Sequence, residues 1–269
     1  MDTAISFQDQ KKVSHDEWIA ARKEFLKKEK EFTRQRDEIS RLRRALPWER
    51  VEKNYIFDGP AGKVPLSDLF DGRRQLVIYH FMLGPGWKEG CPSCSYLADH
   101  FDSMTIHLAN RDVTLAVVSR APIAEIETFK RRMGWKFRWA SSNSSDFNFD
   151  YLVSLTPDEI GKPEVYYNYE MMKFPAEERP GLSVFAKDAS STVFHTYSTY
   201  ARGLDILVGT YNFLDLVPKG RDEAGLKHTM AWVRHHDKYD ENYFVDPNQP
   251  YVQPEVVKPT SGGGSCCHD

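Results

Sequence analysis

The sequence predicts an α/β fold in which a central mixed sheet is flanked by helices. Residues 75–82 and 113–118 form two continuous apolar runs, which are typical of strands buried on both faces. Each run is followed by a segment in which apolar residues recur at helical spacing. The resulting order of strand, helix, strand and helix favours parallel strands in the core, because a helix packed on the sheet can connect them.

A Cys-x-x-Cys motif stands at the start of the first of these helices. Cys91 and Cys94 follow a turn-rich loop, and Pro92 between them has a fixed φ that suits a first helical turn. The partial positive charge of a helix N-terminus stabilises a thiolate, and the second sulfur is one turn away, where it can close a disulfide with the first. The arrangement indicates thiol–disulfide chemistry on a thioredoxin-like fold. The apolar face of the helix is expected to consist of Leu97, Phe101, Met104 and Leu108.

The composition argues against several classes of protein. The chain has 269 residues, of which 41% are hydrophobic and 13% aromatic, enough for a full core in one large or two small domains. A net charge of −3 gives no sign of nucleic-acid binding. No apolar run approaches the roughly 20 residues of a membrane span, and the first residues lack a signal pattern. Four cysteines are too few for a secreted disulfide framework, so we expect a cytoplasmic protein.

A long charged helix is expected within residues 13–47, after a disordered start at 1–12. Ser14 and Glu17 fit a capping box at its beginning, and Pro47 ends it. The apolar stripe is narrow, so we expect it to lie along the domain or along a second subunit, which would make a homodimer through this helix. The stripe residues recur every seven positions and are Trp18, Phe25, Phe32, Ile39 and Leu46.

The thioredoxin-like domain is expected to occupy residues 50–217. A helix that starts at Pro122 should end at Gly134, because glycine is the usual residue just past a helix end. Residues 135–180 are aromatic and lack periodicity, so we interpret them as an insertion packed against the sheet. The other expected elements are strands at 55–57, 63–65, 182–186 and 192–197, a helical turn at 67–70 and a last core helix at 204–216.

The C-terminal part is expected to be irregular. Residues 218–246 form an extension with a short helix at 229–236, and 247–269 are rich in Pro, Gly and Ser, as in a flexible tail. The tail carries two adjacent thiols, Cys266 and Cys267, followed by a histidine. Two roles remain open for them: a separate metal scavenger, or a dithiol that exchanges with the Cys-x-x-Cys pair.

Three stretches of the sequence resemble the DUF899 family. They begin Val-Ser-His-Asp-Glu-Trp at 13, Gly-Cys-Pro-Ser-Cys-Ser at 90 and Phe-His-Thr-Tyr-Ser-Thr-Tyr-Ala-Arg-Gly at 194. The resemblance covers roughly residues 13–240 and concerns a thioredoxin-like group of poorly assigned function. It implies a thioredoxin fold of the peroxiredoxin-like (AhpC-like) branch, with an early hairpin and a redox role that follows mainly from the fold.

A dithiol mechanism fits the candidate catalytic residues. Cys91, expected to be the more exposed sulfur, attacks as a thiolate, and Cys94 resolves the mixed disulfide. An ordinary peroxiredoxin has Thr or Ser and Pro at positions that Cys91 and Trp87 occupy here, which argues against that class. Pro180 best matches the cis-proline that shapes the substrate groove in thioredoxin-like proteins. Arg120 follows the strand at 113–118 and would lower a thiolate pKa or hold an anion, unless it is a surface residue.

Four residues are candidates for substrate binding. Trp87 resembles the aromatic residue that precedes thioredoxin motifs, and alternation places His195 and Tyr197 on one face of a hairpin that should border the Cys-x-x-Cys helix. Arg202 completes the group, and the alternative for these residues is packing of the core and hairpin. The expected substrate is a protein disulfide, glutathione or another small molecule, and no cofactor is required.

Two other functions stay open. Cys91 and Cys94 with His80 or His195 would make a soft site for Cu(I), or for zinc, as in a metal chaperone. His80 is otherwise a buried histidine bonded to the backbone. In the third interpretation the protein binds a small molecule without redox turnover, and the aromatic segment at 135–180 forms the pocket.

Overall fold

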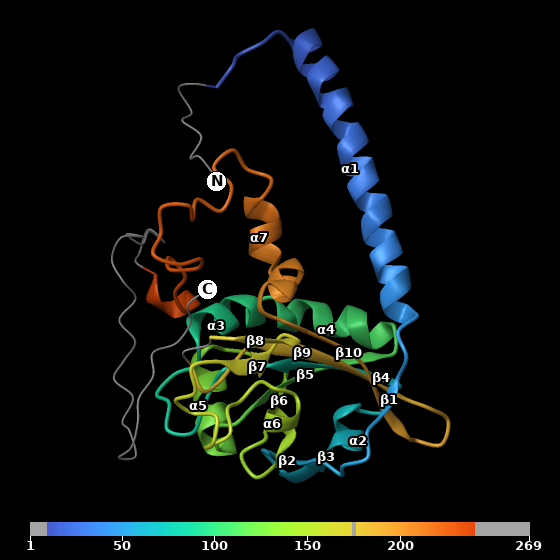
Figure 1. Cartoon of the computed structure of the whole chain (residues 1–269), viewed down its shortest axis with the longest axis vertical. Coiled ribbons are helices and arrows are strands. Elements are labelled where there is room, and N and C mark those ends of the chain that lie inside the picture. Colours follow the sequence, from blue (N-terminus) through green and yellow to red (C-terminus); the bar gives the residue numbers. More distant parts are fainter. Residues whose placement is uncertain (1–9, 174–175, 240–269) are drawn as a thin grey trace.

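The computed structural model describes residues 10–173 and 176–239 (Figure 1). Most of the predicted disordered start, and all of the predicted flexible tail with Cys266 and Cys267, lie outside the described residues. No helix in the described parts is long and apolar enough to cross a membrane.

The main sheet has a thioredoxin-like arrangement at its centre. In the described residues its strand order is β1-β10-β9-β4-β5-β6-β2-β3. Strands β4 and β5 are parallel, β9 is antiparallel to β4, and β10 is antiparallel to β9. Two parallel strands followed by an antiparallel hairpin confirm the predicted fold class. The strands are β1 (Glu49–Arg50), β2 (Ile56–Gly59), β3 (Gly62–Pro65), β4 (Gln75–His80), β5 (Val113–Ser119), β6 (Arg138–Ser141), β9 (Gly181–Lys187) and β10 (Val193–Tyr200).

The predicted insertion at 135–180 is partly wrong, because it contains a strand of the main sheet. Strand β6 pairs in parallel with β5, from Ala116 opposite Arg138 to Ser119 opposite Ser141. Its four residues are too few to show a periodic pattern in the sequence. The rest of the segment holds α6 (Phe147–Asp150) and a separate pair of strands, β7 (Val165–Tyr167) and β8 (Glu170–Met172).

Helices and loops cover both faces of the sheet and enclose two cores. The first core includes Tyr79 and Val117 and is closed by α3 (Pro92–Ala98), α4 (Phe101–Asn110) and α5 (Ile123–Arg132). The second lies on the opposite face, where α2 (Leu66–Leu69) and α6 pack against the sheet beside the predicted β2–β3 hairpin, which forms one edge of the sheet. Successive residues of β4 alternate between the two cores, as strand geometry requires.

The helix predicted from the Cys-x-x-Cys motif to Leu108 is broken in two. Helix α3 ends at Ala98 and α4 begins at Phe101. At the break, the Asp99 carboxylate accepts a hydrogen bond from the Trp135 indole at 2.8 Å. The His100 ring lies 3.1 Å from the Thr210 hydroxyl. These contacts with distant parts of the chain fix the bend.

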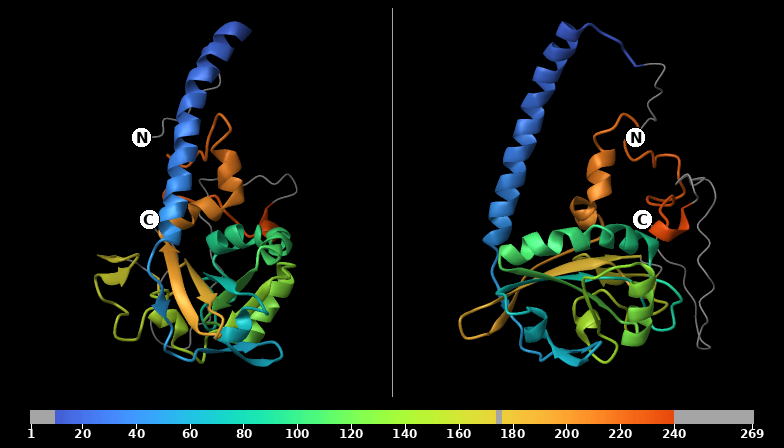
Figure 2. Two further views of the ribbon diagram at one scale, coloured as in Figure 1. Left: turned by 90° about the vertical axis from the view of Figure 1, so that its right-hand side faces the viewer. Right: turned by 180° about the vertical axis from the view of Figure 1, so that it is seen from behind.

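Helix α1 (His15–Arg44) stands away from the domain (Figures 1 and 2). Its predicted capping box is confirmed: the Ser14 N–H donates to Glu17 at 3.0 Å, and the Glu17 N–H donates to the Ser14 hydroxyl at 3.3 Å. No residue of α1 is buried. The expectation that its apolar stripe lies along the domain is therefore wrong, and the stripe faces away from the protein's own core.

The end of the predicted domain and the C-terminal extension lie over α3 and contain less regular helix than predicted (Figures 1 and 2). The expected helix at 204–216 is a 3-10 helix, η1 (Ala201–Leu207), followed by α7 (Gly209–Leu214). The helix expected at 229–236 is absent from the described residues, where only a 3-10 turn, η2 (His236–Lys238), follows. Side-chain contacts to the domain, given below, hold this part in place.

Candidate active site

The two cysteines of the motif are hydrogen-bonded neighbours at the start of α3. Cys91 is the residue just before the helix, and Cys94 lies in its first turn. The Cys91 N–H donates to the Met82 carbonyl at 3.0 Å, and its own carbonyl accepts from the Ser95 N–H at 2.9 Å. Both residues are free thiols, and their side chains are hydrogen-bonded to each other. The sulfurs are therefore near enough to form a disulfide.

The surroundings of Cys94 keep it protonated. Burial raises the pKa of the Cys94 thiol well above its usual value, and the hydrogen bond with Cys91 raises it further. The Tyr79 hydroxyl and the backbone of Met82 also hydrogen-bond this sulfur, and both lower its pKa. Because the first two causes prevail, Cys94 retains its proton and can donate a hydrogen bond to the sulfur of Cys91.

A cleft of about 150 Å³ opens onto the two sulfurs. One wall is the domain itself, and the other consists of residues 201–208 and 228–230, which we call the cover. The domain contributes Tyr79, Met82, Cys91, Ser93, Cys94, Leu97, Tyr167 and Pro180, and the cover contributes Ala201, Arg202, Leu204, Asp205, Val208, His228, Thr229 and Met230. Most of this lining is apolar, so a thiolate formed here is poorly solvated.

The cover leaves both sulfurs almost inaccessible, which corrects the prediction that Cys91 is exposed. Cys91 is 1% exposed and Cys94 is 2% exposed. Ala201 and Met230 in the cover adopt φ values of 46° and 61°. Such values are uncommon for residues with a side chain. The prediction failed because the cover is irregular and its position depends on contacts that no local pattern reveals.

A buried carboxylate attaches the C-terminal extension beside the motif. Glu89, two residues before Cys91, accepts a hydrogen bond from Arg132 at 2.7 Å and from Lys238 at 2.8 Å. The His235 ring lies 2.8 Å from the Gly90 carbonyl. Residues 235–238 are thus tied to the loop that positions Cys91.

Two of the predicted site residues line the cleft with the cysteines. Pro180 does so, but its peptide bond is trans, as are all those in the described residues, so the predicted cis-proline is wrong. The Pro180 carbonyl accepts a hydrogen bond from the Tyr167 hydroxyl at 2.6 Å, and the Ala201 N–H donates to the same hydroxyl. Arg202 also lines the cleft; its side chain is 83% exposed and pairs with Asp205 at 3.2 Å.

Arg120 is engaged elsewhere, so its predicted action on a thiolate is not supported by the geometry. Its Nε lies 2.5 Å from the buried Glu178 carboxylate, and its guanidinium stacks over Phe149. It is not among the cleft residues. Trp87 is half-buried against the first core and also does not line the cleft.

His80, His195 and Tyr197 belong to other parts of the protein. The His80 ring stacks on Phe147 in the second core, on the face of the sheet opposite the cysteines. His195 packs against Phe185 on that same side. Tyr197 lies under Arg43 at the base of α1. The expectation that His195 and Tyr197 line the site is therefore wrong.

The two histidines are connected by a chain of side-chain hydrogen bonds that crosses neighbouring strands. His80 Nε2 lies 2.8 Å from the Ser183 hydroxyl, which lies 2.8 Å from the Ser198 hydroxyl. Ser198 lies 2.7 Å from His195 Nε2, and His195 Nδ1 lies 3.3 Å from Glu49. His80 thus bonds a side chain instead of the predicted backbone group. Burial lowers the pKa of His80 to about 3, so the ring is neutral.

The predicted alternative metal site is not assembled in the described residues. No three His, Cys, Asp or Glu side chains converge there as metal ligands. Sheet alternation separates the two cysteines from His80 and His195.

Sequence reasoning missed Tyr79 and His228. Tyr79 could have been found, because alternation along the strand at 75–82 puts it on the face that the Cys-x-x-Cys helix covers. His228 lies in an irregular segment with no periodic or motif signal.

The sequence matches the profile of one family, described as "Bacterial protein of unknown function (DUF899)", over residues 7–239. No curated protein is significantly similar to the chain.

Three solved structures illustrate a limited similarity to this fold. Peroxiredoxin Q from Xanthomonas campestris is 12% identical, with a TM-score of 0.43 over 61% of this chain and 95% of that chain. Peroxidoxin BcpB from Mycobacterium tuberculosis is 13% identical, with a TM-score of 0.40 over 61% and 95%. A protein from Chlorobium tepidum described as thiol:disulfide interchange protein DsbE is 12% identical, with a TM-score of 0.37 over 61% and 96%.

Proposed function

This chain belongs to the DUF899 family, and we propose that it is a thiol–disulfide oxidoreductase whose redox pair is Cys91 and Cys94. The observation that carries the proposal is the hydrogen bond between the two free thiols at the start of α3, in a cleft shared with Tyr79. Two thiols this close can lose two electrons and two protons to form a disulfide, and the disulfide can take them up again.

We base the proposed roles of the two sulfurs on the environment of Cys94. Cys94 keeps its proton and donates a hydrogen bond to the Cys91 sulfur, so we assign the thiolate to Cys91. This thiolate attacks one sulfur of a substrate disulfide, and the other sulfur leaves as a thiolate. Cys94 then passes its proton to the thiolate that has left and, with the Tyr79 hydroxyl and the Met82 backbone stabilising its charge, attacks the Cys91 sulfur. The second substrate thiolate leaves and takes up from solvent the proton that Cys91 gave up when its thiolate formed. The substrate disulfide is thus reduced to two thiols, and the pair is oxidised to a disulfide.

Access to the pair favours a small substrate. With exposures of 1% and 2%, neither sulfur can be reached by a disulfide on the surface of a folded protein. The cleft continues into a larger pocket of about 580 Å³, which shares Arg202, Asp205, Thr229 and Met230 with it. This pocket contains side chains of both charges, among them Lys219 and Asp215. A low-molecular-weight disulfide with zwitterionic peptide arms, such as oxidised glutathione, fits this combination.

Reduction of a hydroperoxide is a second candidate, because a narrow apolar cleft beside Arg202 suits a small peroxide. The Cys91 thiolate would attack the outer oxygen and become a sulfenic acid, while the other oxygen leaves as an alcohol after taking a proton. Attack by Cys94 on this sulfenic acid would release water and give the same disulfide.

The test uses the full chain with Cys266→Ser and Cys267→Ser, so that only the core thiols react. We expect oxidised glutathione to convert two thiols reversibly into an intramolecular disulfide. Cys94→Ser should accumulate a mixed disulfide with glutathione on Cys91, whereas Cys91→Ser should form neither product. Ser93→Ala is the matched control between them and should behave as the parent.

The outcomes separate the candidates. A parent that ignores oxidised glutathione but consumes a hydroperoxide, with loss of two thiols, supports the peroxidase. The proposal is wrong if the two thiols cannot be oxidised to a disulfide by either substrate, or if both cysteine variants consume substrate as fast as the parent.

A further inference from the structure

The apolar stripe of α1 is an uncovered surface in the described structure. Its four residues within the helix are between 53% and 66% exposed, and Leu46, which lies just past the helix end, is 45% exposed. The helix extends beyond the domain in each view (Figures 1 and 2). Large exposed apolar side chains in a continuous row mark a binding surface. The residues of the row are Trp18, Phe25, Phe32, Ile39 and Leu46.

The spacing of the row specifies the shape of the partner. A strict seven-residue repeat of apolar residues on a helix favours a left-handed coiled coil with a second helix. If the five residues take the first core position of each heptad, the second core position is taken by Ala21, Lys28, Gln35 and Leu42. The seam is apolar at both ends and partly polar in the middle, so we expect a weak and reversible association.

The charges that flank the seam identify the partner as a second copy of this chain. The position before each of the first four stripe residues is glutamate: Glu17, Glu24, Glu31 and Glu38. The position after each second core residue is Arg22, Glu29, Arg36 and Arg43. In a parallel pair of helices, the first row of one helix faces the second row of the other, one heptad further on.

Parallel pairing of two copies therefore brings opposite charges together in most heptads. Glu17 meets Arg22 of the second copy, and Glu31 meets Arg36 of the second copy. Glu38 meets Arg43, which already lies over Tyr197 at the base of the helix. One pairing, Glu24 with Glu29, is repulsive. An antiparallel pair would place the two rows of glutamates against each other, so it is disfavoured.

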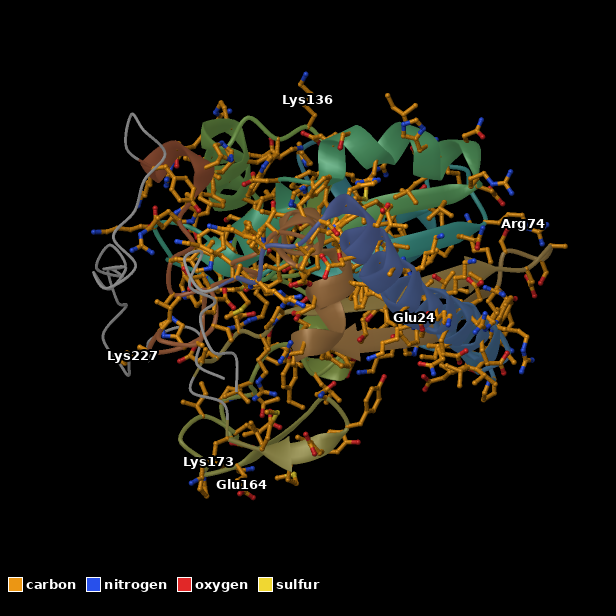
Figure 3. The ribbon with its side chains drawn as sticks, turned by 90° about the horizontal axis from the view of Figure 1, so that it is seen from above. Glu24, Arg74, Lys136, Glu164, Lys173 and Lys227 are labelled. Atoms are coloured by element: carbon orange, nitrogen blue, oxygen red, sulfur yellow. The ribbon has the colours of Figure 1, made fainter. Side chains whose placement is uncertain are left out.

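We infer that two copies of this chain associate through α1 as a parallel coiled coil. Within one chain three of these glutamates form exposed ion pairs, Glu24–Lys27, Glu31–Arg34 and Glu38–Arg41, which can be exchanged at little cost, while Glu17 is bonded to Ser14 in the capping box. Figure 3 looks down on α1 and labels Glu24, which belongs to the glutamate row. Because both domains follow the same end of their helices, the parallel arrangement places them side by side.

The first experiment measures the mass of the full chain in solution by light scattering over a range of concentrations. We expect a concentration-dependent dimer. Phe32→Glu should abolish it, because the change puts a charge into the seam without touching the domain. Leu26→Glu is the matched control: it is also an exposed apolar residue of α1, it lies outside the seam, and it should leave the dimer intact.

Two further variants test the orientation and the charge pattern. Trp18→Cys, in the chain with Cys266→Ser and Cys267→Ser, should cross-link to itself under mild oxidation only if the helices are parallel, since in an antiparallel pair residue 18 would lie near Leu42 at the other end of the partner helix. Glu29→Arg replaces the repulsive pairing by an attractive one and should tighten the dimer about threefold to tenfold.

The inference is overturned if the full chain is a monomer at all concentrations, or if Phe32→Glu and Leu26→Glu behave alike. A chain ending at residue 239 identifies the reason for a monomeric result. If that shorter chain dimerises while the full chain does not, the stripe is occupied by the chain's own C-terminal residues.

Discussion

The hydroxyl of Tyr79 is hydrogen-bonded to the thiol of Cys94, which joins the strand before the motif to the helix after it. The contact lowers the pKa of Cys94, against a larger increase from burial. Burial likewise raises the pKa of Tyr79 well above its usual value, so the phenol stays protonated and remains a donor. A hydrogen-bond donor is thus fixed where negative charge develops when Cys94 becomes the attacking thiolate.

Tyr79→Phe should slow closure of the disulfide without unfolding the protein. The variant loses a hydrogen bond to a charged sulfur, so we expect the step in which Cys94 attacks to be about tenfold slower. Stopped-flow measurement of thiol loss after mixing with oxidised glutathione reports this step. Tyr96→Phe is the control, since Tyr96 is buried on α3 but does not line the cleft. Equal rates in both variants would contradict the role given to Tyr79.

The stability of the reduced protein should fall as the pH rises above the pKa of a free thiol. The pKa of Cys94 is raised in the folded state, so between about pH 8.5 and its folded pKa the folded protein binds more protons than the unfolded chain. One such group lowers the free energy of unfolding by up to about 1.4 kcal/mol per pH unit in that range. Urea titrations at pH 7, 8.5 and 9.5 measure the slope. Cys94→Ala should have a shallower slope; an unchanged slope would show that this thiol ionises as in the unfolded chain.

Glu89→Gln should loosen the C-terminal extension and make the thiols more reactive. The buried carboxylate is shared by Arg132 and Lys238, and its loss leaves both cations without their common partner. Removing one member of a buried ion pair typically costs about 3 kcal/mol or more. Hydrogen exchange of residues 230–239 and the rate of Cys91 alkylation by a bulky reagent should both increase. Glu127→Gln is the control, because Glu127 is a half-buried glutamate of α5 that pairs with Lys130 of the same helix. Protection of residues 230–239 in Glu89→Gln equal to that of the parent would argue against Glu89 as the anchor.

Arg120→Leu should destabilise the fold while leaving the thiol chemistry unchanged. Glu178 is 2% exposed, and Arg120 is its charged partner. Without this partner, we expect a loss of about 3 kcal/mol in the free energy of unfolding. The pH dependence of Cys91 alkylation distinguishes the two roles of Arg120. A shift of this profile towards higher pH would restore the original prediction that Arg120 supports a thiolate.

The parts of the fold that could be predicted are those whose signals are local. The strand at 75–80 is a short apolar run, the capping box of Ser14 and Glu17 involves neighbours in sequence, and the Cys-x-x-Cys pair is placed by the helix that it starts. Each of these features depends on residues within a few positions of one another, so a short stretch of sequence contains all the interacting groups.

The parts that could not be predicted depend on contacts between distant segments. The break between α3 and α4 is fixed by Trp135 and Thr210 acting on Asp99 and His100. The cover over the cysteines is held by links such as that between His235 and Gly90, which are 145 positions apart. A local pattern contains no information about such partners, so the burial of the site could not be foreseen.

The chain of hydrogen bonds from Glu49 to His80 couples the tautomers of two imidazoles. Each serine hydroxyl between the rings can donate only one proton, so if one ring donates from Nε2 at its end, the other must accept at Nε2. When a neutral His195 ring donates a hydrogen bond from Nδ1 to Glu49, its Nε2 is an acceptor, and His80 must carry its proton on Nε2. The bare nitrogen is then His80 Nδ1, which has no hydrogen-bond partner within the described structure. Glu49, on the edge strand β1, thereby determines which nitrogen of the buried His80 ring is unprotonated.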